Sequence, residues 1–157
     1  MRRDEVKLTN KSEGKHLSMA LEQTFAMIKP DAVANGHVGE ILTAVHQNGF
    51  RVVAMRKRRI TKAEAEAFYA IHKDRPFFAG LVKFVIEGPV VTMVLERDDA
   101  IAKWREVMGA TNPANAAEGT IRKRFAENIE RNAAHGSDAA DTAKQEISFF
   151  FSGSELI

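Results

Sequence analysis

The chain has 157 residues, of which 45% are apolar and 28% are charged, the balance of an ordinary globular domain with a hydrophobic core. It has no cysteine, which excludes disulfides and thiolate metal sites, and its formal net charge of +2 is too balanced to indicate a nucleic-acid binder by charge alone. No apolar run is long enough to span a membrane, and Arg2-Arg3 are followed by charged residues rather than by an apolar secretory signal, so we expect a cytoplasmic protein.

Residues 1–18 are polar and have no sustained periodicity. They predict a flexible N-terminal extension, part of which could be a remnant of expression that precedes Met19. Residues 19–157 are then expected to form a single folded domain.

The first predicted element covers residues 24–28, a nearly all-apolar run that indicates a strand buried on both faces. Pro30 ends this run and leaves Lys29 at the end of the strand. A helix over 38–47, where apolar residues recur at helical spacing, and a β-rich segment over 50–60 follow.

A capping box, Thr61 followed by Glu64, opens a helix that we expect to run to about Ile71. The pattern next predicts a helix over 77–86 and a Val-rich strand over 89–95.

Asp98 is placed to cap the helix that comes next. Residues 109–119 contain small residues, Asn and Pro without any period, and an irregular stretch of this length in a compact domain is usually functional. A short helix, a strand near 129–134 and a last helix from Asp138 to about Phe150 complete the chain. This order of elements fits an α+β plait, an antiparallel four-stranded sheet with helices on one face.

The most informative segment is 132–138, with the sequence NAAHGSD. It places His135 just before a predicted helix, where Gly136 allows a tight backbone approach and where Ser137 and Asp138 are placed to cap the helix. Helix amino termini favour anions, so a histidine fixed here suits receiving a phosphoryl group. Taken alone, the segment is explained equally well by a surface histidine before an ordinary capped helix.

The same segment resembles the active-site signature of the nucleoside diphosphate kinases. Each further motif is weak alone, but five of them in the family's order and spacing are highly specific, and the resemblance covers about residues 22–156. Ala139-Ala140 depart from the family, which often has Ser and then a larger aliphatic residue at the helix start. The five motifs are Lys29-Pro30-Asp31, Arg75-Pro76-Phe77-Phe78-Ala79-Gly80, Gly88-Pro89-Val90-Val91, Gly109-Ala110-Thr111-Asn112-Pro113 and Gly119-Thr120-Ile121-Arg122.

The resemblance implies that residues 19–157 are a nucleoside diphosphate kinase domain with a ferredoxin-like plait, a four-stranded antiparallel sheet with covering helices. It also implies a ping-pong reaction in which a nucleoside triphosphate phosphorylates His135 and a second nucleoside diphosphate then takes the phosphoryl group. Such an enzyme maintains the pools of nucleoside triphosphates. The intermediate divides the transfer into two easier steps, and a neutral imidazole is a suitable nucleophile near physiological pH.

Glu146 is expected on the side of the last helix that carries small and apolar residues, where a lone carboxylate needs a partner. A hydrogen bond from one nitrogen of the His135 ring would fix its tautomer and leave the other nitrogen free to attack. The resemblance implies this role for Glu146 and places Ser137 among the catalytic residues. From the residues alone, a solvated Glu146 at the helix edge is at least as acceptable.

A transferring phosphoryl group spreads negative charge over its oxygens, so its transfer needs positioned cations. Lys29, Arg105 and Arg122 fit this task, and Thr111 adds a hydroxyl donor. By resemblance, the Tyr69 hydroxyl lies near the phosphohistidine with Lys29. Read singly, each cation is more often a solvated surface charge, and Tyr69 is explained by partial core packing.

Phe77 matches the family residue that stacks on the nucleobase, and stacking explains tolerance of many nucleotides because every base has a π-face. Ile129 matches the position that packs on the other side of the base, and Asn132 matches the residue that reads the ribose hydroxyl. His72 matches a contact to the substrate phosphates. Core packing remains the alternative for Phe77, and a plain helix-end residue the alternative for His72.

Mg²⁺ is the expected cofactor, and it would arrive mainly on the substrate phosphates because no carboxylate cluster suggests an all-protein cage. The expected partners are ATP, GTP and other nucleoside triphosphates and diphosphates. The resemblance also implies a homotetramer or homohexamer built from a common dimer. The tetramer stays open because the chain ends at Ile157, without the longer tail of many eukaryotic members.

The rival interpretation is a plait-fold nucleic-acid-binding module. Arg56-Lys57-Arg58-Arg59 would be its basic patch and Phe77-Phe78 its stacking platform. Such a basic run is more often a solvated strand edge, and no RNP-like motif of Gly and aromatic residues supports this module. Nucleic acid is therefore not an expected partner, nor is a membrane.

Overall fold

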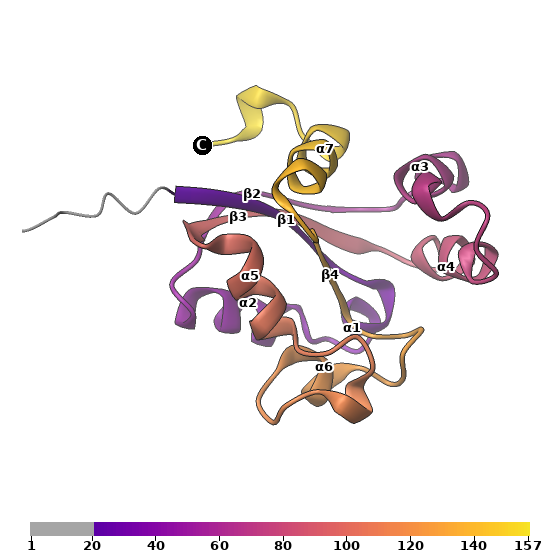
Figure 1. Ribbon diagram of the computed structural model, residues 1–157, viewed down its shortest axis with the longest axis horizontal. Coiled ribbons are helices and arrows are strands. Elements are labelled where there is room, and N and C mark those ends of the chain that lie inside the picture. Colours follow the sequence, from indigo (N-terminus) through magenta and orange to yellow (C-terminus); the bar gives the residue numbers. More distant parts are fainter. Residues whose placement is uncertain (1–20) are drawn as a thin grey trace, which may run out of the picture.

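The computed structural model describes residues 21–157, so the predicted extension over 1–18 lies outside the described residues. Four antiparallel strands form one sheet in the order β2-β3-β1-β4 (Figure 1). They are β1 (Leu21–Ile28), β2 (Arg51–Arg58), β3 (Val90–Asp98) and β4 (Ala134–Gly136). This sheet confirms the predicted α+β plait.

Residues 21–157 also form seven α-helices and three short 3₁₀ turns, of which all but the last helix and the last turn lie between strands. The α-helices are α1 (Pro30–Ala34), α2 (Val38–Gln47), α3 (Lys62–Phe68), α4 (Phe78–Val85), α5 (Ala100–Met108), α6 (Ile121–Phe125) and α7 (Ala140–Phe150). The 3₁₀ turns are η1 (Ala70–His72), η2 (Pro113–Asn115) and η3 (Gly153–Glu155). No helix in this part of the chain is long and apolar enough to cross a membrane.

Helices cover both faces of the sheet, so the prediction that they lie on one face was wrong. Successive side chains of β1 alternate between two separate clusters: Ala26 and Ile28 pack with α2 and α5, while Phe25 and Met27 pack with α3, α4 and α7. Figure 1 shows α7 on one side of the sheet and α2 and α5 on the other. The nearly continuous apolar run of β1 is the sequence signal of this two-sided burial.

Two predicted helix starts differ from the structure. Asp98 is the last residue of β3, and α5 begins after Asp99, whose side chain makes no capping hydrogen bond. A distant carboxylate takes over this role, because Glu22 Oε1 accepts a hydrogen bond from the Ile101 N–H at 2.8 Å. The start of α7 is likewise not capped by Ser137 or Asp138; the N-cap is Ala139, whose N–H donates to Thr142 Oγ1 at 3.0 Å.

The predicted strand near 129–134 is shifted to Ala134–Gly136. Asn128 is the reason, since its Oδ1 accepts hydrogen bonds from the N–H groups of Glu130 and Arg131, both at 2.9 Å, and so folds this segment into a tight turn. The predicted helix from Thr61 to about Ile71 is also shorter than expected. It ends at Phe68, although its start is capped as predicted by Thr61, which accepts from the Glu64 N–H at 3.2 Å.

Candidate active site

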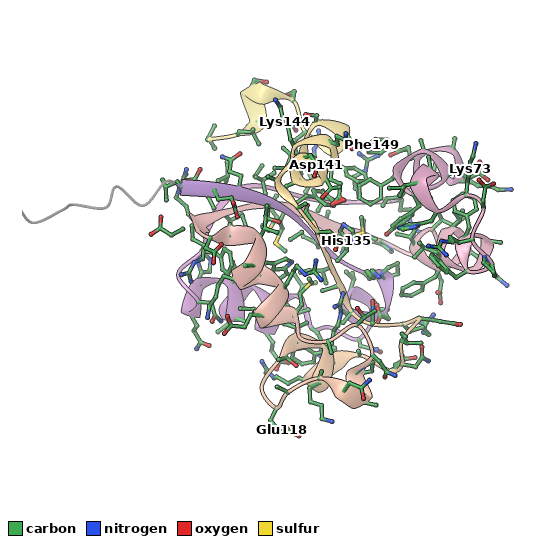
Figure 2. The ribbon with its side chains drawn as sticks, in the orientation of Figure 1. Lys73, Glu118, His135, Asp141, Lys144 and Phe149 are labelled. Atoms are coloured by element: carbon green, nitrogen blue, oxygen red, sulfur yellow. The ribbon has the colours of Figure 1, made fainter. Side chains whose placement is uncertain are left out.

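His135 is placed by the short strand β4, which pairs with the central strand β1 so that His135 lies opposite Met27. Figure 2 shows His135 near the middle of the molecule, on the ribbon of β4. The indole N–H of Trp104 in α5 donates to the His135 carbonyl at 3.2 Å. Gly136 permits this approach, because a Cβ there would lie 2.5 Å from Trp104.

Glu146 and Ser137 fix the imidazole. His135 Nε2 lies 2.8 Å from Glu146 Oε1 and 3.3 Å from Oε2, and the same Oε1 accepts a hydrogen bond from Ser137 Oγ at 2.9 Å. Ser137 is itself buried and also accepts from the Phe25 N–H at 3.3 Å. Both ring hydrogen bonds made by the described residues use Nε2, so Nδ1 has no hydrogen-bond partner among residues 21–157.

Aromatic rings surround this pair on the face of the sheet that carries α3 and α7. The His135 ring centroid lies 5.9 Å from that of Phe25, 5.5 Å from that of Phe68 and 6.4 Å from that of Tyr69. Tyr69 is buried, and its hydroxyl has no hydrogen-bond partner among residues 21–157. Burial, followed by the nearby charge of Glu146, raises the pKa of Tyr69, so the phenol stays protonated and able to donate.

Lys29 and Asn132 form the second group of the site. Lys29 follows β1 and is 7% exposed, and its Nζ donates to Asn132 Oδ1 at 2.8 Å although the two residues are 103 positions apart. The Asn132 amide in turn donates to the Thr111 carbonyl at 3.3 Å. Burial and then the charge of Arg122 lower the pKa of Lys29 to about 8, against the opposing charge of Asp31. Lys29 is thus a buried cation and not a solvated surface charge.

Arg122 is also buried, at 8% exposure, which its sequence pattern did not indicate. Its guanidinium donates to three backbone carbonyls, those of Asn132 at 3.3 Å, Gly109 at 3.0 Å and Ala134 at 2.9 Å. The side chain therefore ties the irregular segment 109–119 to the chain around His135. Burial, followed by the charge of Arg105, lowers the pKa of Arg122 to about 10, so it remains cationic at neutral pH.

The remaining predicted residues lie toward the surface. Arg105 in α5 donates to Asp138 Oδ1 at 2.9 Å, and its side chain is exposed. His72 and Phe77 lie together with ring centroids 5.4 Å apart, and Phe77 is 52% exposed. Ile129 is likewise exposed at the tight turn. The exposure of Phe77 removes core packing as its explanation.

Three residues near the site had no role in the sequence-based interpretation. Asp31 accepts a hydrogen bond from the Ala133 N–H at 3.0 Å, Phe68 packs on the His135 ring, and Trp104 holds the His135 carbonyl. Only Asp31 had a sequence signal, because it belongs to the Lys29-Pro30-Asp31 motif. Apolar periodicity accounts for the presence of Phe68 and Trp104 in their helices. It does not reveal that Phe68 contacts the His135 ring or that Trp104 donates to the His135 carbonyl.

Comparison with known proteins decides the family. Residues 22–156 match the family described as nucleoside diphosphate kinase. The chain is 59% identical over 135 residues to the nucleoside diphosphate kinase of Oleidesulfovibrio alaskensis, which spans 86% of this chain and 97% of that protein. It is 58% identical over 139 residues to that of Azorhizobium caulinodans, covering 88% and 99%. The chain belongs to the nucleoside diphosphate kinase family.

Solved structures of nucleoside diphosphate kinases agree with this assignment. That of Aquifex aeolicus superposes with a TM-score of 0.86 at 42% identity and covers 88% of this chain and 100% of its own. That of Halobacterium salinarum, in complex with CDP, superposes with a TM-score of 0.84 at 43% identity and covers 87% and 91%. These relatives confirm the ferredoxin-like fold and the enzyme class: the chain is a kinase that transfers phosphoryl groups between nucleoside triphosphates and diphosphates.

The nucleic-acid-binding alternative is not favoured. Within its basic run, Arg56 pairs with Glu155 at 3.4 Å, and Arg58 pairs with Glu64 while lying over the Phe150 ring. Two of the four cations are therefore engaged inside the kinase fold.

Proposed function

We propose that His135 is the nucleophile of this kinase and that transfer proceeds through a phosphohistidine. The hydrogen bond between His135 Nε2 and Glu146 at 2.8 Å carries this proposal. With the Nε2 proton directed to the carboxylate, Nδ1 is unprotonated and can attack the terminal phosphorus of a nucleoside triphosphate. The bond from that phosphorus to the bridging oxygen breaks and the diphosphate leaves. A terminal oxygen of a second diphosphate then attacks the phosphohistidine and regenerates the imidazole.

The cations are proposed to neutralise the charge that develops on the transferring group. Lys29 shares the face of β1 with Phe25 and Met27 by strand alternation, and this is the face on which His135 packs. Its ammonium and the Tyr69 hydroxyl are buried donors, which are worth more than solvated ones because little water screens them. Arg122 is proposed to act by contributing positive potential and by fixing the loop that carries Thr111, with Arg105 reaching the phosphates from the rim.

The nucleoside is proposed to lie between exposed apolar side chains at the edge of the molecule. Phe77 would stack on the base, Ile129 would pack on its other side, and the adjacent His72 would approach the phosphates. Asn132 would meet the ribose hydroxyl while its Oδ1 stays with Lys29. ATP, GTP and other nucleotides are the proposed substrates, because nothing in this arrangement reads one base.

Mg²⁺ is proposed as the divalent cation. The buried cations Lys29 and Arg122 suit phosphate oxygens, and within residues 21–157 no group of three or more His, Asp or Glu side chains is arranged to hold a metal ion. Mg²⁺ bound to the substrate phosphates would neutralise part of their charge. Lys29 and Arg122 would then complete the neutralisation around the transferring group.

A homotetramer or homohexamer built from a common dimer is the proposed assembly, and the cytoplasm is the proposed location. β2 is an edge strand of the described sheet, and its Met55 is half exposed, which favours pairing with a second copy.

The decisive experiment measures covalent phosphorylation. The enzyme is incubated with γ-labelled ATP and no acceptor, and the protein label should be stable in base and labile in acid. His135→Ala should remain folded and lose both the label and turnover. His46→Ala is the matched control because His46 is exposed on α2, and it should keep both. Normal transfer by His135→Ala would refute the proposal.

A further inference from the structure

Asp31 is a buried carboxylate to which the proposed reaction gives no role. It is 1% exposed in the first turn of α1. Oδ2 accepts the Ala133 N–H, whereas Oδ1 is buried and has no hydrogen-bond partner among the described residues. Burial raises the pKa of Asp31, and the Ala32 and Ala133 N–H groups and the charge of Lys29 oppose this effect. Because a buried, half-satisfied carboxylate is costly, its presence calls for a compensating role.

The backbone that Asp31 holds is strained. Ala133 has a φ of 71°, in the left-handed region that non-glycine residues rarely adopt. Its N–H is held by Asp31 at 3.0 Å, and its carbonyl accepts the Lys29 N–H at 2.9 Å. The residues on either side are Asn132, whose side chain turns back to Lys29, and Ala134, which begins β4. This one turn therefore sets the position of Asn132 and, two residues later, of His135.

Asp31 is also the negative charge closest in sequence to Lys29. The charged groups around the Lys29 ammonium are Asp31 from α1, Arg122 from α6, and Arg131, whose guanidinium lies 5.0 Å from the centroid of the Phe84 ring that the ammonium also approaches. Two of these three are cations. Burial and Arg122 favour the neutral amine, and Asp31 is the group that opposes them.

We propose that Asp31 is a positioning residue for phosphoryl transfer, which holds the turn that places Asn132 and His135 and supplies a negative charge two residues from Lys29. This inference rests on the proposed roles of Lys29, Asn132 and His135, and it adds a role for Asp31. It also explains the spacing of the Lys29-Pro30-Asp31 motif. Pro30 opens α1, and the turn of the helix brings the carboxylate back beside the end of β1.

Asp31→Asn separates charge from geometry, because the amide oxygen can still accept the Ala133 N–H. We expect kcat/KM at neutral pH to fall by only roughly twofold to tenfold, because the hydrogen bond is kept and only the charge that favours protonated Lys29 is lost. The basic limb of the kcat/KM profile should also move to lower pH, because Lys29 would lose the charge that favours its protonated form. In a Lys29→Arg background this limb should be absent both with Asp31 and with Asp31→Asn, since arginine stays charged.

Asp31→Glu keeps the charge and displaces the oxygen, so it tests the other half of the proposal. It should leave the basic limb in place and lower kcat, because the turn at Ala133 is no longer held in register. Glu66→Gln removes a carboxylate from the exposed face of α3 and is the control, with rates and limb unchanged. The melting temperature of each variant is measured alongside the kinetics. This distinguishes a variant that has unfolded from a folded variant whose His135 and Asn132 are misplaced.

The outcomes are distinct from those that test the proposed function. If the parent enzyme takes up label on His135 and Asp31→Asn keeps both the parental rate and the parental basic limb, the role of Asp31 is refuted alone. If the parent takes up no label, the phosphohistidine proposal fails first. A well-folded Asp31→Asn with a lowered rate and a shifted limb supports the inference.

Discussion

At the scale of single residues, the site combines groups whose environments differ sharply. Lys29 and Arg122 are buried cations whose pKa values are lowered by burial, whereas Arg105 stays in solvent beside Asp138. A buried cation is already desolvated before the substrate arrives, so its attraction to phosphate is stronger than that of a solvated one. The imidazole of His135, the proposed nucleophile, is held by the partly buried carboxylate of Glu146, which also accepts a hydrogen bond from Ser137.

Glu146→Gln should slow the reaction without abolishing it. The amide keeps a hydrogen-bonding group near His135 but removes the charge that favours the reactive tautomer. We expect turnover to fall by roughly one to two decades, the range typical of groups that orient a functional histidine. Steady-state transfer from ATP to a second nucleoside diphosphate measures this. An unchanged rate would show that Glu146 has no part in orienting the ring.

Lys29 should impose a basic limb on the kcat/KM profile of the free enzyme. Its pKa is lowered to about 8, so the charged fraction, and with it phosphate binding, should fall as the pH rises through 8. Lys29→Arg should have lower activity but no limb in this range, because a guanidinium stays protonated. A limb that persists in Lys29→Arg would assign it to another group.

At the scale of elements, apolar periodicity predicted most helices and strands, but not which of their side chains meet. The helix over 38–47 has the bounds that its pattern indicates, since Ile41 and Val45 repeat at helical spacing and are buried. The strand near 129–134 was misplaced because the Asn128 turn competes with it locally. Helices were predicted on one face only, because many antiparallel sheets are open to solvent on the other face. The nearly continuous apolar run of β1 was the one sequence feature that indicated burial on both faces.

The candidate site residues could be named from motifs in the sequence, but the contacts between them could not. His135, Lys29 and Asn132 lie in motifs that the sequence displays, so the resemblance could name them. The role of Asp31 could not be read from the sequence, because it depends on the left-handed turn at Ala133, 102 positions away. A hydrogen bond of that kind leaves no local pattern.

The residue that precedes α4 allows a test of how the nucleobase is bound. Phe77 precedes this helix with half of its surface exposed, and Phe77→Ala should weaken purine and pyrimidine nucleotides alike, by about 1–3 kcal/mol if stacking dominates. Binding is compared by calorimetry for one purine and one pyrimidine diphosphate. Weakening for only one base would indicate that hydrogen bonds, and not stacking, recognise the base.

At the scale of the whole molecule, the segment 109–119 is held by few buried side chains. Within it only Ala116 is buried, and the segment is anchored through Arg122 to the Gly109 carbonyl and through Asn132 to the Thr111 carbonyl. Neighbouring subunits could brace such a loop, which links the proposed assembly to stability more than to chemistry.

Pro113→Ser should therefore lower the melting temperature more than it lowers activity at moderate temperature. Pro113 opens η2 with a fixed φ, and serine would loosen the loop at the point where a neighbour could contact it. Light scattering on the parent decides the main point, because a mass near the 17.4 kDa of one chain at micromolar concentration would refute the oligomer. Equal losses of activity and stability in Pro113→Ser would place the loop's role in catalysis instead.

The pairing of β1 with β4 has a consequence for the order in which the enzyme is made. β1 is the first described strand to leave the ribosome and β4 is the last. The hydrogen bond between Lys29 and Asn132 therefore cannot form until 103 further residues have been synthesised. Contacts this distant in sequence form late because long loops must close first. A growing chain can thus pair β1, β2 and β3 first, yet remain without His135, the proposed nucleophile, and without Glu146, the carboxylate proposed to orient it. We therefore expect catalytic competence to appear only after these last elements have been synthesised.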